Sequence, residues 1–299
     1  MIWSVSNTQL FKNCPRKWFF SNNVVYGKNL DEVQQNVKSL KSIQTIYAWR
    51  GILVDSIISN QIIPILNKKQ ELFPQNLIDN AKHEAMNQIH SLRNSSSEFS
   101  LFEIEYGNNF DDKLLNQCLD DIELSLRNLL KSKFIQEFYE FGTRLVAQRS
   151  FSYNNGNFTV RGKPDVLAFY NNRPPMIVDW KVQQNSHMDH LKQLSVYAVI
   201  VSKCNPHKDL LQEWDYLLDP TKIDLLEFQL LHGRERMYNI EEDDVVEIED
   251  FIFTSGTSIL HMFGDKKYPD VKYSDVPTTQ NPNYCSRCKF KKLCWEDTN

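Results

Sequence analysis

Apolar positions recur at spacings of three and four along the first half of the chain, the spacing typical of amphipathic helices. They predict helices at residues 6–20, 41–66, 75–93 and 111–141. The last is the most regular, with Leu115, Leu119, Ile122, Leu126 and Leu129 on one face. The polar run Asn94-Ser95-Ser96-Ser97 predicts a loop.

The pattern changes after residue 143. Stretches rich in Val, Ile and Phe at 144–153, 157–169 and 175–182 are separated by Asn-Asn-Gly and Asn-Asn-Arg-Pro-Pro turns, which predicts consecutive strands of a meander. A helix at 187–203, strands near 223–231 and 234–240, and a helix from the acidic run at 241–244 to about 263 follow. This order predicts an α/β fold with a helical insertion at about 60–141.

Composition places few limits on function. With 299 residues, 41% hydrophobic and 24% charged, the sequence is typical of a globular protein. The net charge of −4 gives no overall support for a nucleic-acid partner, so that argument must rest on local charge. The first residues lack a signal-peptide pattern and no apolar stretch is long enough to span a membrane, so we expect a cytoplasmic protein with reduced thiols.

Four cysteines are candidate metal ligands. Cys285, Cys288 and Cys294 lie within a C-terminal segment at 283–299, and Cys14 lies in the first predicted helix. Thiolates at this spacing suit an iron–sulfur cluster or a structural zinc ion, and either would join the two ends of the chain. Cys118 and Cys204 are predicted to be buried core residues.

Basic residues surround these cysteines. A cluster that joins the chain ends would gather them into a phosphate-binding patch, with a solvated basic face as the alternative. They are Lys12, Arg16, Lys17, Arg287, Lys289, Lys291 and Lys292.

Two carboxylates and a lysine form the candidate catalytic group. Asp179 and Lys181 are two apart on a predicted strand and therefore face the same side, and a hairpin brings Asp165 near them. Paired carboxylates suit Mg²⁺ or Mn²⁺, and a nearby lysine can orient water or stabilise phosphate charge. An ordinary salt bridge is the alternative. Gln193 and Tyr197, at i and i+4, share one face of the next helix.

These motifs, in this order, resemble the PD-(D/E)XK nuclease superfamily, in its RecB-like or Cas4-like branch that carries an iron–sulfur cluster. The motifs that match are Cys14-Pro15-Arg16-Lys17, Gly162-x2-Asp165, Asp179-Trp180-Lys181, Gln193-x3-Tyr197 and the terminal cysteine triplet. The resemblance implies one nuclease domain over 1–299, with a restriction-endonuclease-like core.

By this resemblance the protein is a metal-dependent deoxyribonuclease acting on single strands or free ends. Asp165, Asp179 and the Trp180 carbonyl would hold Mg²⁺ or Mn²⁺, Lys181 would position the attacking water, and Gln193 and Tyr197 would organise the site. Cys14, Cys285, Cys288 and Cys294 would bind a structural 4Fe-4S cluster, and Arg16, Lys17, Arg287, Lys289, Lys291 and Lys292 would bind DNA. Partners in repair, recombination, phage or CRISPR-adaptation complexes are also implied.

One position departs from the branch, which has a metal-binding histidine where Trp49-Arg50-Gly51-Ile52-Leu53-Val54-Asp55 supplies Asp55. Asp55 either replaces the imidazole with an oxygen ligand or is an ordinary polar helix residue, with His83 and Glu84 as a distant alternative ligand pair. The substitution also leaves open a catalytically weak DNA-binding subunit with the same fold.

Overall fold

The computed structural model describes residues 1–94, 99–107, 110–182 and 190–296. The predicted loop at 94–97 falls largely outside these residues, as do the first three residues of the predicted helix at 187–203 and the last three of the C-terminal segment. The N-terminal part contains β1 (Ile2–Trp3), α1 (Val5–Asn13), α2 (Pro15–Asn22), α3 (Glu32–Lys41) and β2 (Ile43–Gln44).

A helical region follows, as the sequence predicts. Its elements are α4 (Ile46–Ile57), the π-helix η1 (Ile58–Ile62), α5 (Ile63–Asn67), α6 (Pro74–Arg93), β3 (Ser100–Leu101), α7 (Phe102–Glu105), α8 (Asp112–Leu130) and α9 (Lys133–Phe141). The prediction of one continuous helix at 111–141 is wrong, because this segment forms two helices, α8 and α9. It is interrupted at Ser132, whose hydroxyl caps α9 by accepting from the Ile135 amide.

The first predicted helix, 6–20, is also divided, at Cys14. Proline disfavours the helical conformation in the residue before it. Pro15 follows Cys14, which is extended (φ −163°) and ends α1. The Cys14 Sγ then accepts from the Lys17 amide at 3.4 Å and caps α2. The Cys14 thiol consequently lies at the N-terminus of α2.

The second half contains most of the sheet. Its elements are β4 (Gly142–Ala147), β5 (Phe151–Asn154), β6 (Thr159–Gly162), β7 (Val166–Tyr170), β8 (Met176–Lys181), α10 (His190–Lys203), β9 (Asp224–Gln229), β10 (Arg234–Tyr238), α11 (Glu242–Phe263), α12 (Pro282–Ser286) and α13 (Lys291–Glu296). Short 3₁₀ helices lie at Lys208–Leu210, Trp214–Leu217, Pro220–Lys222, Leu230–His232 and Tyr273–Asp275.

The predicted meander is wrong, because two of its strands are each divided between two sheets. The central five-stranded sheet has the order β10-β9-β8-β7-β4, parallel only between β8 and β9, whereas β5 and β6 form a separate sheet with β1. Gln148 interrupts the first stretch with a left-handed backbone (φ 50°). Pro164 interrupts the second because it has no amide for a strand ladder.

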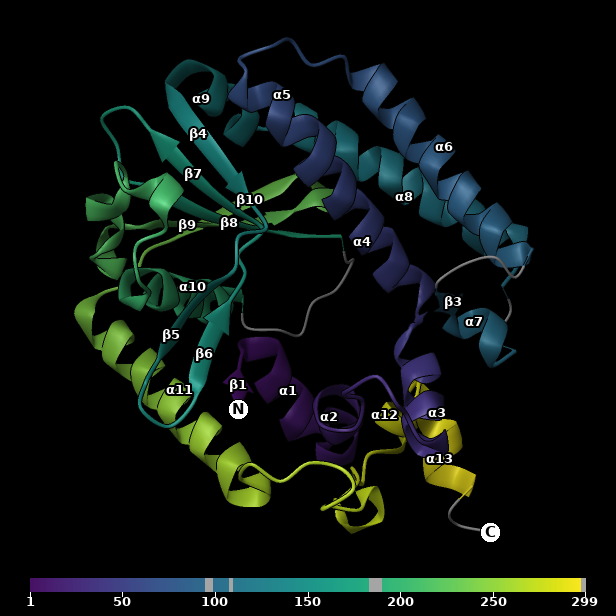
Figure 1. Cartoon of the computed structure of the whole chain (residues 1–299). Coiled ribbons are helices and arrows are strands. Elements are labelled where there is room, and N and C mark those ends of the chain that lie inside the picture. Colours follow the sequence, from purple (N-terminus) through teal and green to yellow (C-terminus); the bar gives the residue numbers. More distant parts are fainter. Residues whose placement is uncertain (95–98, 108–109, 183–189, 297–299) are drawn as a thin grey trace.

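Helices cover both faces of this mixed central sheet, which confirms the predicted α/β class (Figure 1). Side chains of β7 alternate between the faces: Val166 and Ala168 pack with the α4–α9 region, and Leu167 and Phe169 pack with α10. A third apolar cluster joins the two ends of the chain through Phe20 and Phe290, whose ring centroids are 5.1 Å apart. Among the described residues, no helix has the length and apolar character needed to cross a membrane.

Candidate functional site

Asp179 and Lys181 project from the same face of β8 toward α10. Asp179 is only 2% exposed, and its carboxylate is ion-paired with the Lys181 ammonium. Gln193 of α10 lies between them: its Oε1 accepts from Lys181 Nζ at 3.3 Å, and its Nε2 donates to Asp179 Oδ1 at 3.3 Å. Gln193 Nε2 also donates to the Tyr197 hydroxyl at 2.8 Å. The i, i+4 pair therefore makes direct contact and orients both charged side chains.

Gly162, the first residue of the Gly-x-x-Asp motif, allows β6 to approach α10 closely. A Cβ at this position would lie 2.9 Å from Ile200 Cδ1 and 3.0 Å from Tyr197 Cδ1, which is closer than such atoms normally approach. The glycine thus has a packing role. It lets Tyr197 lie against the strand that leads into Asp165.

Asp165 is held from the neighbouring strand. The backbone amide of Trp180 donates to Asp165 Oδ2 at 2.9 Å, which fixes the carboxylate beside Asp179. Burial raises the pKa of Asp165 to about 8, and the charge of Asp179 adds to the rise. Burial also raises the pKa of Asp179. Two crowded, poorly hydrated carboxyl groups are an arrangement that a divalent cation stabilises.

Asp55 reaches the same place from α4. Its Oδ1 accepts from the Trp180 indole Nε1 at 3.0 Å and from Gln148 Nε2 at 2.6 Å. Gln148 Nε2 also donates to Asp165 Oδ1 at 3.1 Å. The amide therefore lies between two carboxylates, where its donors occupy the kind of position that a cation would take. Gln148 has no signal in the sequence, because its role depends on a left-handed backbone and on contacts 93 residues away.

Arg50 is a second residue that the sequence interpretation missed. Its guanidinium is 3% exposed and donates to the Asp121 carboxylate on α8 and to the Val182 carbonyl, just after β8. It fixes the helix that carries Asp55 against the strand that carries Asp179 and Lys181. The Arg-Gly motif quoted above is its only sequence signal.

A third missed group lies behind Asp179. Glu227 on β9 pairs in register with Asp179 and is fully buried. Burial opposes ionisation of Glu227, but hydrogen bonds from Tyr238 (2.7 Å) and Gln229 (2.8 Å) hold its pKa below the usual value. The charge of this carboxylate on the neighbouring strand contributes to the raised pKa of Asp179.

One cavity of about 310 Å³ is lined by the predicted catalytic and metal-binding side chains, which are Asp55, Asp165, Asp179, Lys181, Gln193 and Tyr197. Its other lining residues are Tyr47, Ala48, Gly51, Ile52, Trp180 and Val182. His83 and Glu84, on α6, are not part of this lining. Within the described residues, no three His, Cys, Asp or Glu side chains are gathered tightly enough to hold a metal ion as they stand. The oxygen donors have the chemistry that Mg²⁺ or Mn²⁺ requires.

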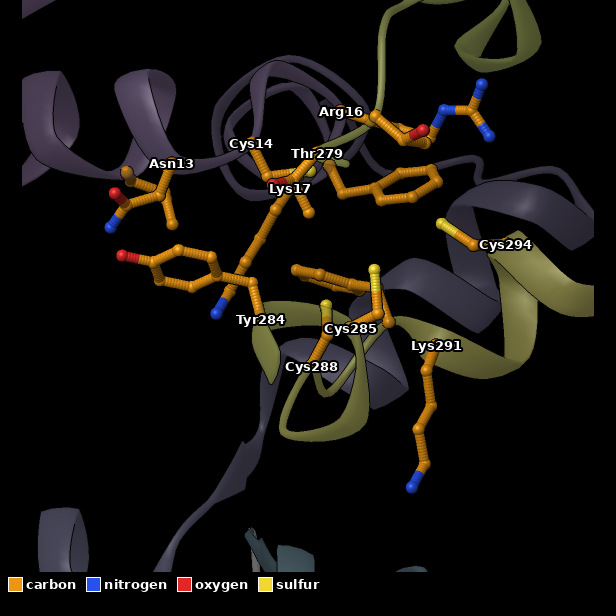
Figure 2. A pocket seen from close by; sticks show the side chains of 14 residues that line it. Asn13, Cys14, Arg16, Lys17, Thr279, Tyr284, Cys285, Cys288, Lys291 and Cys294 are labelled. Atoms are coloured by element: carbon orange, nitrogen blue, oxygen red, sulfur yellow. The ribbon is translucent and has the colours of Figure 1, made fainter. Parts of the chain in front are cut away.

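The four predicted cysteine ligands line a different cavity, of about 430 Å³. Figure 2 shows the sulfur atoms of Cys285, Cys288 and Cys294 directed toward the space beside Cys14. Burial raises the pKa of Cys294 to about 11, and it raises the pKa of Cys288 with a contribution from the neighbouring Cys14 and Cys285. The donor set, four soft thiols from both ends of the chain around one space, fits an iron–sulfur cluster.

Residues 2–295 match the model of the PD-(D/E)XK nuclease superfamily. The chain belongs to this superfamily. No curated protein sequence matches it significantly. The match over residues 2–295 confirms the resemblance at the level of the superfamily, and membership implies a metal-dependent nuclease.

Two solved structures are similar to this PD-(D/E)XK protein at low identity. One, from Eubacterium rectale and described as a "putative exonuclease", is 13% identical, with a TM-score of 0.40 over 91% of this chain and 89% of the other. The other, described as SSO0001, is 16% identical, with a TM-score of 0.28 over 64% of this chain and 78% of the other. Neither likeness is close enough to carry an argument about activity.

Several of the basic residues predicted to bind DNA have structural partners in this nuclease. The Lys289 ammonium donates to the carbonyls of Lys41 (2.7 Å) and Ile43 (3.2 Å), and burial lowers its pKa. Arg16 donates to the carbonyls of Val276 (2.9 Å) and Ser274 (3.0 Å).

The remaining predicted DNA-binding residues differ in their surroundings. Lys292 pairs with Glu105, and the Lys291 ammonium lies 4.1 Å from the Tyr106 ring centroid. Lys17 lines the cysteine cavity, and Arg287 is exposed. A role in DNA binding stays a prediction for all six residues.

Proposed function

We propose that the protein is a Mg²⁺- or Mn²⁺-dependent deoxyribonuclease that hydrolyses phosphodiester bonds in single strands or at free ends. The observation that carries this proposal is the convergence on one cavity of Asp55 from α4, Asp165 from the bend before β7, and Asp179 from β8. Lys181 lines the same cavity. Superfamily membership supports the reaction class.

In this proposal the three aspartates, with the Trp180 carbonyl, hold the cation. The bound cation supplies a Lewis acid and neutralises the crowded carboxylates. The chain's own residues do the positioning. Lys181 is held by Asp179 and Gln193 at the wall of the cavity, where its ammonium can orient water or stabilise charge on the phosphate. The Tyr197 hydroxyl accepts a hydrogen bond from Gln193 and so keeps the Gln193 amide directed toward Asp179 and Lys181.

The test is cleavage of end-labelled single- and double-stranded DNA with Mg²⁺ or Mn²⁺. We expect Asp179→Ala and Lys181→Ala to lower the rate by at least about 100-fold, the range for loss of an aligned electrostatic group. Lys163→Ala, which changes an exposed lysine near the same motif, is the matched control. Absence of metal-dependent cleavage by anaerobically purified protein contradicts the enzyme proposal. Unchanged cleavage by both variants contradicts the site.

We further propose that the protein belongs to the RecB-like or Cas4-like branch and that Cys14, Cys285, Cys288 and Cys294 hold a 4Fe-4S cluster. The shared cavity and the cap that Cys14 forms on α2 support this. The cluster would connect the two ends of the chain and would have no redox step in the reaction. A cytoplasmic location belongs to this proposal because it keeps the thiols reduced.

The alternative is a DNA-binding subunit with weak or no activity, in a repair, recombination or CRISPR-adaptation complex. Its basis is the aspartate at position 55 in place of the histidine of the branch. Two donors direct Asp55 Oδ1 into the group that contains Asp165, which favours the active enzyme. DNA binding without metal-dependent cleavage would favour the alternative.

A further inference from the structure

Tyr47 has an exposed ring at the cavity that contains the proposed catalytic group. It lies on α4, two turns before Asp55, and 53% of the residue is exposed although it lines the cavity. Eight residues at 1.5 Å each place it about 12 Å from Asp55 along the helix axis. Aromatic rings of this size usually bury most of their surface, so an exposed one beside a site is a candidate ligand contact.

The ring also contacts a side chain that is itself fixed. The Arg50 guanidinium lies 5.3 Å from the Tyr47 ring centroid, within cation–π range, and is itself fixed by Asp121 and Val182. A ring that is held in place loses little entropy when a second planar group stacks on it.

The helix between Tyr47 and Asp55 leaves room for a ligand. A Cβ at Gly51 would meet nothing within 4 Å, although Gly51 lines the cavity and lies in a helix interior. Glycine costs about 1 kcal/mol relative to alanine at such a position. Ile52, which is 55% exposed, extends the apolar side of the cavity, whereas Lys181 and the carboxylates form its polar side.

We infer that Tyr47 is the stacking platform for an unpaired nucleobase whose backbone continues toward Lys181 and the carboxylates. This inference rests on the proposed function and specifies its substrate as single-stranded or frayed DNA. A paired base in a duplex has both faces covered by its neighbours, so only an unpaired base offers a free face to the ring.

The test combines a protein variant with a change in the DNA. Single-stranded oligonucleotides with one abasic position, moved nucleotide by nucleotide, are cleaved by the wild type, Tyr47→Ala and Tyr47→Phe. We expect one position at which loss of the base raises the KM of the wild type by about 5- to 150-fold, the range of base–aromatic stacking. Tyr47→Phe should behave as the wild type. Tyr47→Ala should already have the raised KM on the intact oligonucleotide, and the abasic position should not raise it further.

Tyr216→Ala, which removes a tyrosine with 65% exposure at a different cavity, is the control and should match the wild type. Gly51→Leu should fill the cavity, raise KM and leave the melting temperature equal or higher. Equal lesion effects in wild type and Tyr47→Ala would overturn the inference, as would a loss in Tyr47→Phe as large as in Tyr47→Ala.

Failure of the proposed function is distinguishable from failure of this inference. If the wild type cleaves no DNA, fluorescence anisotropy with the same labelled oligonucleotides still measures the coupling between Tyr47 and the abasic position. Coupling without cleavage contradicts the enzyme proposal and supports the platform. Cleavage without coupling contradicts the platform alone.

Discussion

The guanidinium of Arg50 donates to the carbonyl of Val182, 132 residues away, and so ties the helix that carries Asp55 to the strand that carries Asp179. The same guanidinium is paired with the buried Asp121 carboxylate. One side chain therefore has two roles, which mutagenesis can separate: it neutralises a buried charge, and it sets the position of α4 relative to β8.

Replacing Arg50 alone should strongly destabilise the fold. Arg50→Met leaves Asp121 charged and unpaired in the core, a change that costs about 3–5 kcal/mol in the free energy of unfolding. Arg50→Met with Asp121→Leu removes both charges and should recover most of that loss. The double variant should still cleave DNA slowly, because the contact to Val182 stays absent. Urea unfolding and cleavage rates measure the two effects, and full recovery of both would show that the Val182 contact is dispensable.

Gln148 should orient Asp55 and Asp165 through its amide while its backbone carries strain. Gln148→Ala removes the amide but keeps a side chain at φ 50°, whereas Gln148→Gly removes both. We expect the glycine variant to be more stable than the alanine variant by about 1 kcal/mol, because a Cβ is disfavoured in the left-handed region. Cleavage should fall to a similar extent in both. Wild-type rates in either variant would mean that the amide does not position the carboxylates.

The carboxylate group should make stability depend on pH and on divalent cations. The pKa of Asp165 is about 8 in the folded protein, above its ordinary value near 4, so the folded state binds the proton more tightly. The stability that this proton contributes is complete below about pH 4 and is lost as pH rises toward 8. Asp165→Asn should reduce this loss of stability with rising pH. Thermal unfolding in EDTA between pH 5 and 8.5 measures the difference.

Mn²⁺ should oppose the same loss of stability, because it binds the ionised carboxylates of the folded state. The rise in melting temperature on adding Mn²⁺ should be larger at pH 8 than at pH 5.5, and it should be small in Asp165→Asn. An equal rise in wild type and Asp165→Asn at pH 8 would place the cation elsewhere.

The cysteine cavity should hold iron. Anaerobically purified wild type should be brown and contain iron and sulfide, and Cys14→Ala should lose both because a ligand from the other end of the chain is missing. Cys204→Ala, which changes a buried cysteine away from the cavity, is the control that should keep the cluster. Stoichiometric zinc without iron would replace the cluster proposal with a structural zinc site.

Loss of this centre should also loosen the chain ends. The same Cys14→Ala variant should expose the segments around α2 and α13 to limited proteolysis sooner than the wild type, since metal binding contributes to folding free energy. Without the centre, these segments keep only non-covalent contacts such as that between Phe20 and Phe290, while the central sheet does not depend on the centre. We therefore expect faster cleavage at the termini with the central sheet still protected.

The sequence determined what depends on local periodicity. Strand alternation placed Asp179 and Lys181 on one face, and helical spacing placed Gln193 and Tyr197 together, because these geometries follow from backbone period alone. The predicted helices near 75–93 and 241–263 correspond closely to α6 and α11 for the same reason.

Only the tertiary structure decided which of these faces meet. Three contacts join residues far apart in the chain, and no local period encodes them. They are the pairing of β6 with β1, the hydrogen bond from Arg50 to Val182, and the position of Gln148 between Asp55 and Asp165. The cavity that brings Cys14 to the C-terminal cysteines likewise depends on packing between the two ends. Spacing in the sequence indicated the chemistry of these groups, and long-range packing, which depends on the shape of the whole core, set their arrangement.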